Sequence, residues 1–234
     1  MHGIMVAVLG GFRLVHAGHV VEMSPGTERV LAFVALHSQP VGRLLVAGTL
    51  WSEASERRAY AALRSSLSRL DPVARRALSV DPIAVRLADG VAVDLHDARA
   101  LAHRLLAPAP TLPEDDLSPA AIVALSRDLL PGWYEDWVLL ESEDWRQLRL
   151  HALEALAERL TAAGRFGEAA LAAVAAIRAD PLRESARACL IRVYLTEGNQ
   201  SEALREFKRF SHTLRAELGL APTPQLRKLV ETLL

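Results

Sequence analysis

Hydrophobic and polar side chains alternate along residues 6–23, VAVLGGFRLVHAGHVVEM. A period of two is typical of β-strands, and it is interrupted here at Gly10-Gly11 and at Ala17-Gly18. Glycine suits tight turns because it adopts positive φ at little steric cost. The segment therefore predicts a small antiparallel sheet with tight turns, and it places Gly18 in a hairpin turn.

A helical spacing of apolar residues replaces this alternation after residues 24–27, SPGT. Residues 28–37 and 41–51 predict two short helices, and residues 55–70 predict a third. Each has apolar positions three and four residues apart, which would line one face of a helix. We therefore expect three consecutive helices after the opening sheet.

The period of two returns after Ala77. Residues 78–80, 85–87 and 91–93 predict strands, and Asp89-Gly90 predicts the turn of a terminal hairpin. Strands, helices joined by a tight turn and a final hairpin are the elements of a winged helix-turn-helix. That architecture places its last helix in a major groove of DNA.

The helix expected over residues 55–70 has two unlike faces. Its apolar positions recur at helical spacing: Ala59, Leu63, Leu67 and Leu70. The opposite side combines cations with small side chains: Arg57, Arg58, Ala61, Ser65, Ser68 and Arg69, with Arg64 on the flank. Arginine can bind phosphates or guanine edges, and small residues let a helix approach a groove closely. The helix is a candidate recognition helix, and the alternative is an ordinary amphipathic surface helix.

The second half of the chain is predicted to be helical after a loop rich in proline and acid at residues 107–118. Large rings follow a break at Pro131-Gly132, and we expect them to hold the first helices together: Trp133, Tyr134, Trp137 and Trp145. A repeat comes next, in which five residues recur thirty-four positions later: Leu156, Leu160, Gly164, Glu168 and Ala169 return as Leu190, Tyr194, Gly198, Glu202 and Ala203. This is the tetratricopeptide period, so paired helices should stack here, with a last helix over residues 225–234 covering the end.

Charge is distributed unevenly along the chain of 234 residues, whose net charge is −1. Residues 1–97 carry ten basic and nine acidic residues, whereas residues 113–144 carry one arginine and nine acids. The acidic middle therefore hides mildly basic flanks, and the whole-chain charge does not exclude a nucleic-acid partner. The single cysteine, Cys189, stands in an apolar helical context, which predicts a buried, inert thiol.

Segments of the chain resemble, in order, the Streptomyces antibiotic regulatory protein family, in which an OmpR-type winged helix precedes a bacterial transcriptional activation domain. The first half carries AVLGGFRLVHAGHVVEM, RVLAFVALHSQPV, LLVAGTLW and ALRSSLSRL. The second half carries LLPGWYEDWV, RLTAAGRFGEAAL, ADPLRESA, EGNQSEALREF and ELGLAPTPQL. The fold expected is mainly α with small β elements: a winged helix-turn-helix over residues 1–97 and an all-α, tetratricopeptide-like activation domain over residues 98–234.

The resemblance implies a cytoplasmic transcriptional regulator, usually an activator of a biosynthetic gene cluster. Its expected partners are double-stranded DNA, bound at direct repeats near promoters by head-to-tail pairs, and RNA polymerase holoenzyme. A homodimer is implied, and whether it forms only on DNA stays open. No apolar run is long enough to span a bilayer and the N-terminus has no basic leader, so we expect no membrane partner.

Eight residues are candidates for contact with DNA. Arg58, Ser65 and Arg69 are placed for groove contact, and Arg57, Arg64 and Ser68 could bind phosphates beside them. Arg86 in the hairpin could reach the minor groove or backbone, or be a solvated strand residue. Arg43, near the start of the second helix, could bind a phosphate or be a plain surface charge.

No catalytic motif is present in the sequence. The histidines are scattered, GxSxG and HExxH are absent, and Gly10-Gly11 lies in a turn rather than in a phosphate-binding loop. We expect neither an enzyme nor a bound cofactor or metal. The alternative function is a protein-interaction module with a degraded winged helix, which Asp71 favours because the family usually has an arginine there.

Overall fold

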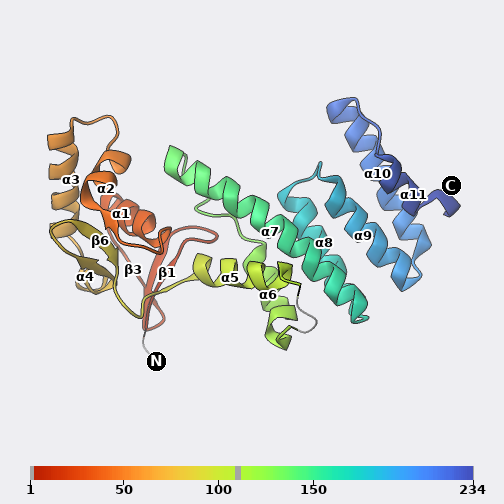
Figure 1. Cartoon of the computed structure of the whole chain (residues 1–234), viewed down its shortest axis with the longest axis horizontal. Helices are drawn as coiled ribbons and strands as arrows, with labels where there is room; N and C mark the ends of the chain where they lie inside the picture. The colour runs from red at the N-terminus through yellow and green to blue at the C-terminus, as the bar shows by residue number, and fades with distance from the viewer. Residues whose placement is uncertain (1–2, 109–111, 234) are drawn as a thin grey trace. The chain divides into compact units, whose positions relative to one another are not determined.

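The structure, a computed structural model, describes residues 3–108 and 112–233 (Figure 1). It has the expected fold class, mainly helical with two small sheets. Two compact units are present: Met1–Asp97 with Asp128–Glu143, and Ala98–Arg127 with Asp144–Leu234. Along the chain, the first unit ends at Asp97 and the second begins at Ala98. The chain returns to the first unit for residues 128–143.

The larger sheet of the first unit has the strand order β3-β2-β1-β7. Its strands are β1 (Ile4–Ala7), β2 (Arg13–His16), β3 (His19–Val21) and β7 (Ala92–Val93). The β2–β3 pair is antiparallel, and Ala17 and Gly18 at its turn have φ of 51° and 80°. Positive φ at both central residues is typical of a type I′ turn, so the hairpin turn predicted at Gly18 is confirmed.

Three helices supply much of the core of the first unit: α1 (Pro25–Ala35), α2 (Arg43–Leu50) and α3 (Glu56–Ser68). Each lies within a predicted helical segment or at its start, but residues 41–42, predicted as helix, form strand β4 because they pair with Ala84 and Val85. Residues 30–36 of α1 and its C-cap are all at most 4% exposed. Every residue of this stretch is buried, on all sides of the helix, because α1 packs against α2, α3, β1 and β6 rather than against a single surface.

A fourth helix, α4 (Pro72–Ala77), was not predicted from the sequence. The Asp71 carboxylate accepts a 2.7 Å hydrogen bond from the Val73 N–H, and Pro72 occupies the first turn, where no N–H is needed. Pro72, expected only to end the preceding helix, therefore also begins the next one.

The wing is a three-stranded sheet in the order β4-β6-β5, formed by β4 (Val41–Gly42), β6 (Ala84–Leu87) and β5 (Leu78–Val80). Its hairpin turn lies at residues 81–83, where the Asp81 carboxylate accepts hydrogen bonds from the Ile83 and Ala84 N–H groups. The predicted hairpin at Asp89-Gly90 is wrong. The strand after Gly90, β7, pairs in parallel with β1 of the other sheet.

Residues 128–143 complete the first unit from much further along the chain. The Gly10 N–H donates to the Asp128 carbonyl at 2.8 Å, and the Leu130 N–H donates to the Val8 carbonyl at 2.9 Å. The Trp137 ring meets Phe33 edge-on, with ring centroids 5.2 Å apart. The segment thus pairs with residues 8–10, directly after β1, and packs on α1.

The aromatic residues do not form the single cluster predicted from the sequence. Trp133 and Trp137 pack in the first unit, whereas the buried Trp145 belongs to the second unit. Tyr134 is 80% exposed and holds nothing together. Sequence proximity was misleading because helix α7 (Asp136–Ala162) begins in one unit and continues in the other.

The second unit is all helical. Its remaining elements are α5 (Asp94–Leu106, which begins in the first unit), η1 (Glu114–Leu117), α6 (Pro119–Leu125), α8 (Phe166–Ala179), α9 (Glu184–Glu197), α10 (Gln200–Leu218), α11 (Pro224–Leu229) and η2 (Glu231–Leu233). Residues 109–111 of the predicted loop and Leu234 of the predicted last helix lie outside the described residues. None of the helices that the structure describes is long and apolar enough to cross a membrane.

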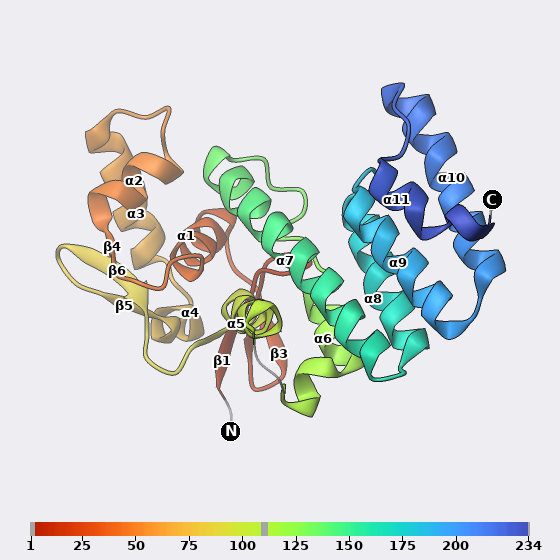
Figure 2. The same ribbon diagram turned by 45° about the vertical axis from the view of Figure 1, so that its right-hand side comes forward.

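The predicted repeat is present down to its backbone hydrogen bonds. The Arg165 N–H donates to the Leu160 carbonyl, and the Asn199 N–H donates to the Tyr194 carbonyl, thirty-four positions later. Gly164 and Gly198 both have positive φ, which ends each first helix in the same way. Figure 2 shows α8, α9 and α10 side by side, as stacked tetratricopeptide-like helices are.

Candidate nucleic-acid interface

Helix α3 presents the two faces that the sequence predicts. Ala59, Leu63 and Leu70 are buried, and Leu67 is half-buried. Ser66 is buried as well, because α1 approaches so closely that a Cβ at Gly26 would lie 3.2 Å from the Ser66 hydroxyl. The remaining face is free of packing and open to solvent.

The exposed face carries most of the candidate residues. Those exposed are Arg57, Arg58, Ala61, Arg64, Ser68 and Arg69, and Ser65 is half-exposed. Within residues 3–108 and 112–233, Arg57, Arg58 and Arg64 have no carboxylate partner within ion-pair distance. Three cations beside a small alanine therefore remain available for an anionic ligand.

Three other candidates contact one another at the C-terminus of α3. The Ser65 carbonyl accepts hydrogen bonds from the Ser68 hydroxyl at 2.9 Å and from Arg69 Nε at 3.2 Å, and Arg69 Nη2 also donates to the Ser65 hydroxyl. Arg75 of α4 donates to the Ser68 carbonyl at 3.1 Å. These cations satisfy carbonyls at the negative end of the helix dipole, so Arg69 has a structural role in the free protein.

Arg86 of the wing is paired within its own hairpin region. Its Nη1 lies 2.7 Å from an Asp89 carboxylate oxygen and 3.2 Å from the Leu87 carbonyl. Its side chain is half-exposed. The arrangement favours the interpretation of Arg86 as a paired strand residue over that of a free DNA contact.

Arg43 is the first residue of α2, directly after β4. Its Nη1 donates to the Asp81 carbonyl at 3.2 Å, and its guanidinium lies over the Tyr60 ring of α3, 5.4 Å from the ring centroid. Hydrogen bonds from the Ala84 and Ile83 amides lower the pKa of the Asp81 carboxyl below its usual range, and the nearby cations of Arg43 and Arg86 lower it further. Arg43 is therefore engaged with the wing and with α3 at once.

Tyr60, Arg75 and Arg76 adjoin this region and were not singled out in the sequence. Tyr60 stands four residues before Arg64, the spacing at which two side chains on a helix can meet, and the Arg64 guanidinium is 6.0 Å from its ring centroid. Arg76 of α4 lies 3.1 Å from the His16 ring. The Arg75-Arg76 pair following Asp71-Pro72 was the available indication of a capped basic helix.

The acids that could neutralise α3 do not pair with its free arginines. Asp71 caps α4, and Glu53 and Glu56 are exposed with no ion pair to Arg57, Arg58 or Arg64 among the described residues. The exposed face of α3 therefore keeps a local positive charge, although residues 1–97 as a whole are close to neutral.

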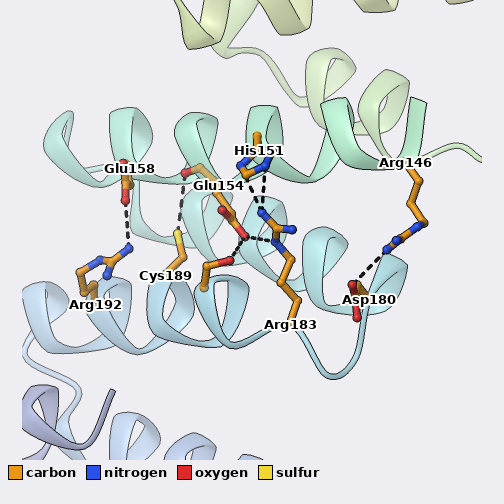
Figure 3. Close-up of polar contacts among 9 residues, drawn as sticks. Arg146, His151, Glu154, Glu158, Asp180, Arg183, Cys189 and Arg192 are labelled. Carbon is orange, nitrogen blue, oxygen red and sulfur yellow. Dashed lines mark hydrogen bonds and ion pairs between the residues drawn. The ribbon is translucent and has the colours of Figure 1, made fainter. Parts of the chain in front are cut away.

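Polar contacts in the second unit join the two repeats (Figure 3). Glu154 of α7 accepts from Arg183 and from Ser185 at 2.7 Å each, and Glu158 pairs with Arg192 of α9 at 2.9 Å. Burial raises the pKa of the Cys189 thiol to about 12, as its predicted inertness requires. No group of metal-ligating side chains that could hold an ion occurs among the residues the structure describes.

Comparison with known proteins identifies the second half of the chain and relates the whole of it to regulators. Residues 118–234 match the family described as bacterial transcriptional activator domain. The chain is 30% identical over 241 residues to the regulatory protein AfsR of Streptomyces coelicolor and 29% identical over 247 residues to that of Streptomyces griseus. Each alignment covers 97% of this chain but 24% of AfsR.

A solved structure has the same fold over nearly the whole chain. Mycobacterium tuberculosis EmbR, determined in complex with a low affinity phosphopeptide, superposes with a TM-score of 0.71 at 25% identity. The match covers 97% of this chain and 64% of the EmbR chain. The winged helix and the helical repeat unit thus occur together in both proteins.

Proposed function

The chain belongs to the Streptomyces antibiotic regulatory protein family and carries its bacterial transcriptional activator domain, and we propose that it regulates transcription by binding specific DNA sequences. The observation that carries this proposal is the exposed face of α3. Arg57, Arg58 and Arg64 lie there without carboxylate partners among the described residues, and Ala61 leaves room for a groove. The rest of the winged helix holds this helix by its apolar side.

The candidate residues take different roles in the proposed complex. Arg58 is the first choice for a base contact in the major groove, and Arg57 and Arg64 are suited to flanking phosphates. Arg69, Ser65 and Ser68 require their helix-end hydrogen bonds to be exchanged for contacts with DNA. Arg86 would have to leave Asp89, so it ranks last among the proposed contacts.

The wider role follows the family. We propose an activator that binds direct repeats near promoters as head-to-tail pairs, helps to recruit RNA polymerase holoenzyme and acts on a biosynthetic gene cluster. We place the contact between copies on the helical repeat unit, whether the dimer forms in solution or only on DNA. Because the chain spans 24% of each AfsR, these roles concern the two units described here.

The test is binding of the full chain to double-stranded fragments selected from its own genomic DNA, across a series of salt concentrations. Arg58→Ala should weaken binding to the selected fragment by about 1–3 kcal/mol and relax its sequence preference. Arg57→Ala should weaken all sequences alike and reduce the salt slope by about one. Arg178→Ala, which removes an exposed arginine of the second unit, is the matched control.

A second candidate function is a protein-interaction module whose winged helix binds DNA weakly or not at all. The intramolecular contacts of Arg43, Arg69 and Arg86 favour it, because they occupy three of the candidate cations. Salt-sensitive, sequence-selective binding at micromolar concentration or below would reject this alternative. Its absence up to tens of micromolar would reject the regulator that binds DNA by itself.

A further inference from the structure

Arg43 lies where three elements of the winged helix meet. It follows β4, whose residues Val41 and Gly42 pair with Val85 and Ala84 of β6, and it begins α2. Its own N–H donates to the Ile83 carbonyl at 2.8 Å. The backbone of Arg43 is therefore already bound to the wing turn.

The side chain of Arg43 repeats this connection and extends it to α3. One guanidinium nitrogen donates to the Asp81 carbonyl at 3.2 Å, while the guanidinium carbon lies 5.4 Å from the centre of the Tyr60 ring. Its Nε is buried and has no hydrogen-bond partner among the described residues. This half-buried arginine is committed to two contacts within the protein, and contact with a phosphate would compete with them.

The wing turn is held as a unit by its own hydrogen bonds. Asp81 Oδ1 accepts from the Ile83 and Ala84 N–H groups at 2.7 Å each, and the Asp81 N–H donates to the Ala84 carbonyl at 3.1 Å. Ile83 at its tip is 81% exposed. The turn is held by hydrogen bonds within itself, and its tip is exposed to solvent. Its position relative to α3 therefore depends on the contacts that Arg43 makes with it.

We propose that Arg43 is a positioning residue, which fixes the wing turn relative to α3 through the Asp81 carbonyl and the Tyr60 ring, and that it is not a phosphate ligand. Its effect on DNA rests on the proposed function: a winged helix engages DNA with its recognition helix and wing together, so their separation must match the duplex. Tyr60 is the residue of α3 that Arg43 contacts, and the Arg64 guanidinium lies near the same ring.

The first experiment measures amide hydrogen exchange in the free full chain and does not depend on DNA. Arg43→Lys keeps the charge but loses the planar guanidinium that lies over the Tyr60 ring while it donates to the Asp81 carbonyl. Tyr60→Leu removes the ring, and Tyr60→Phe keeps it. We expect exchange at the Arg43 amide, which donates to the wing turn, to be about tenfold faster in Arg43→Lys and Tyr60→Leu and unchanged in Tyr60→Phe. Exchange at wild-type rates in both of the first two variants would overturn the proposal.

The second experiment compares DNA binding by the same variants. If Arg43 is a positioning residue, we expect the Arg43→Lys and Tyr60→Leu variants to bind the selected fragment about tenfold more weakly than the wild type, with an unchanged salt slope. A phosphate ligand predicts instead that Arg43→Lys binds nearly as the wild type and that Arg43→Ala lowers the slope by about one, and this result would also overturn the proposal. Absence of binding by the wild-type chain would reject the proposed function, and the exchange result would still decide the role of Arg43.

Discussion

Arg29 of α1 and Glu135, just before α7, form an ion pair with 3.1 Å between Nε and Oε1, and about a third of each side chain is exposed. Arg29 Nη2 also donates a 2.7 Å hydrogen bond to the Leu50 carbonyl at the end of α2. One guanidinium therefore joins two helices of the winged helix to the segment that returns from the second half of the chain.

Arg29→Ala should lower the free energy of unfolding of the first unit by about 1–2 kcal/mol, because a charged hydrogen bond to a helix end is lost with the ion pair. Thermal or denaturant unfolding, followed by amide signals of the first unit, measures the change. Arg13→Ala, also at an exposed arginine of this unit, should change stability by less than about 0.5 kcal/mol. Equal effects of the two substitutions would contradict a specific role of Arg29.

Trp137→Ala should destabilise the winged-helix unit although the residue belongs to helix α7. Its ring is 9% exposed and packs edge-on against Phe33, so truncation should reduce stability by about 3–5 kcal/mol. Tyr134→Ala, three residues earlier and 80% exposed, is the matched control and should be nearly neutral. Loss of stability confined to amides of the second unit would show that Trp137 does not complete the first.

Glu206→Gln should strongly destabilise the second unit. Glu206 is 2% exposed and accepts hydrogen bonds from Arg187 and Arg209, and the Arg187 guanidinium also lies 5.4 Å from the Phe210 ring centre. Neutralising the acid leaves Arg187 buried without its counter-charge, which should reduce stability by about 3–5 kcal/mol. Unfolding in urea tests this. The same change at Glu202, which pairs with Arg205 at the surface, should have less than about 1 kcal/mol of effect.

Asp116 should make stability fall in acid. Two hydrogen bonds from Arg104, at 2.7 and 2.8 Å, lower the pKa of this buried carboxyl below its ordinary value of 3.8. A lowered folded-state pKa contributes stability that is present above 3.8 and is lost as the pH falls through the folded-state value. Unfolding measured from about pH 6 to pH 2 should therefore decline more steeply in the wild type than in Asp116→Asn. Asp115→Asn, at the exposed neighbour, should follow the wild-type curve.

Ala61→Leu should impair DNA binding without impairing the fold. Ala61 is exposed on the arginine-bearing face of α3, and leucine is almost as good a helix former, so stability should change by less than about 0.5 kcal/mol. The added side chain would stand between the helix and the groove, and affinity for the selected fragment should fall at least about tenfold, or about 1.4 kcal/mol. Ala120→Leu on α6 adds the same bulk elsewhere, and wild-type affinity of Ala61→Leu would remove α3 from the interface.

The periodic elements of the fold could be predicted from the sequence, and the pairing of short segments could not. The apolar stripe of α3 and the repeated Gly164 and Gly198 are local patterns, and each lies where expected. Strand β7 is two residues long, so its sequence cannot tell the wing from the opening sheet, and its parallel partner β1 lies far away in sequence. The same holds for Trp137, whose partner Phe33 belongs to a helix more than a hundred residues earlier.

The sequence predicted which candidate residues of α3 are exposed, but it did not predict which of the candidates contact other residues of the protein. Helical period placed Arg57, Arg58 and Arg64 on the open face correctly. Which arginines are already engaged depends on side-chain conformation, as in Arg69 folding back on Ser65. The link from Arg43 to Tyr60 joins two helices, and no spacing within either helix encodes it.

The return of residues 128–143 to the first unit imposes an order of assembly during synthesis. When residue 97 leaves the ribosome, the strand and helices of the winged helix are complete in sequence, but Trp137 and the carbonyl of Asp128 that pairs with Gly10 have not yet been made. Phe33 and residues 8–10, directly after β1, remain without these partners while α5 and α6 are translated. The nascent winged-helix unit is therefore finished only after part of the second unit has been made, and a gene fragment cut at residue 97 would encode it without residues 128–143.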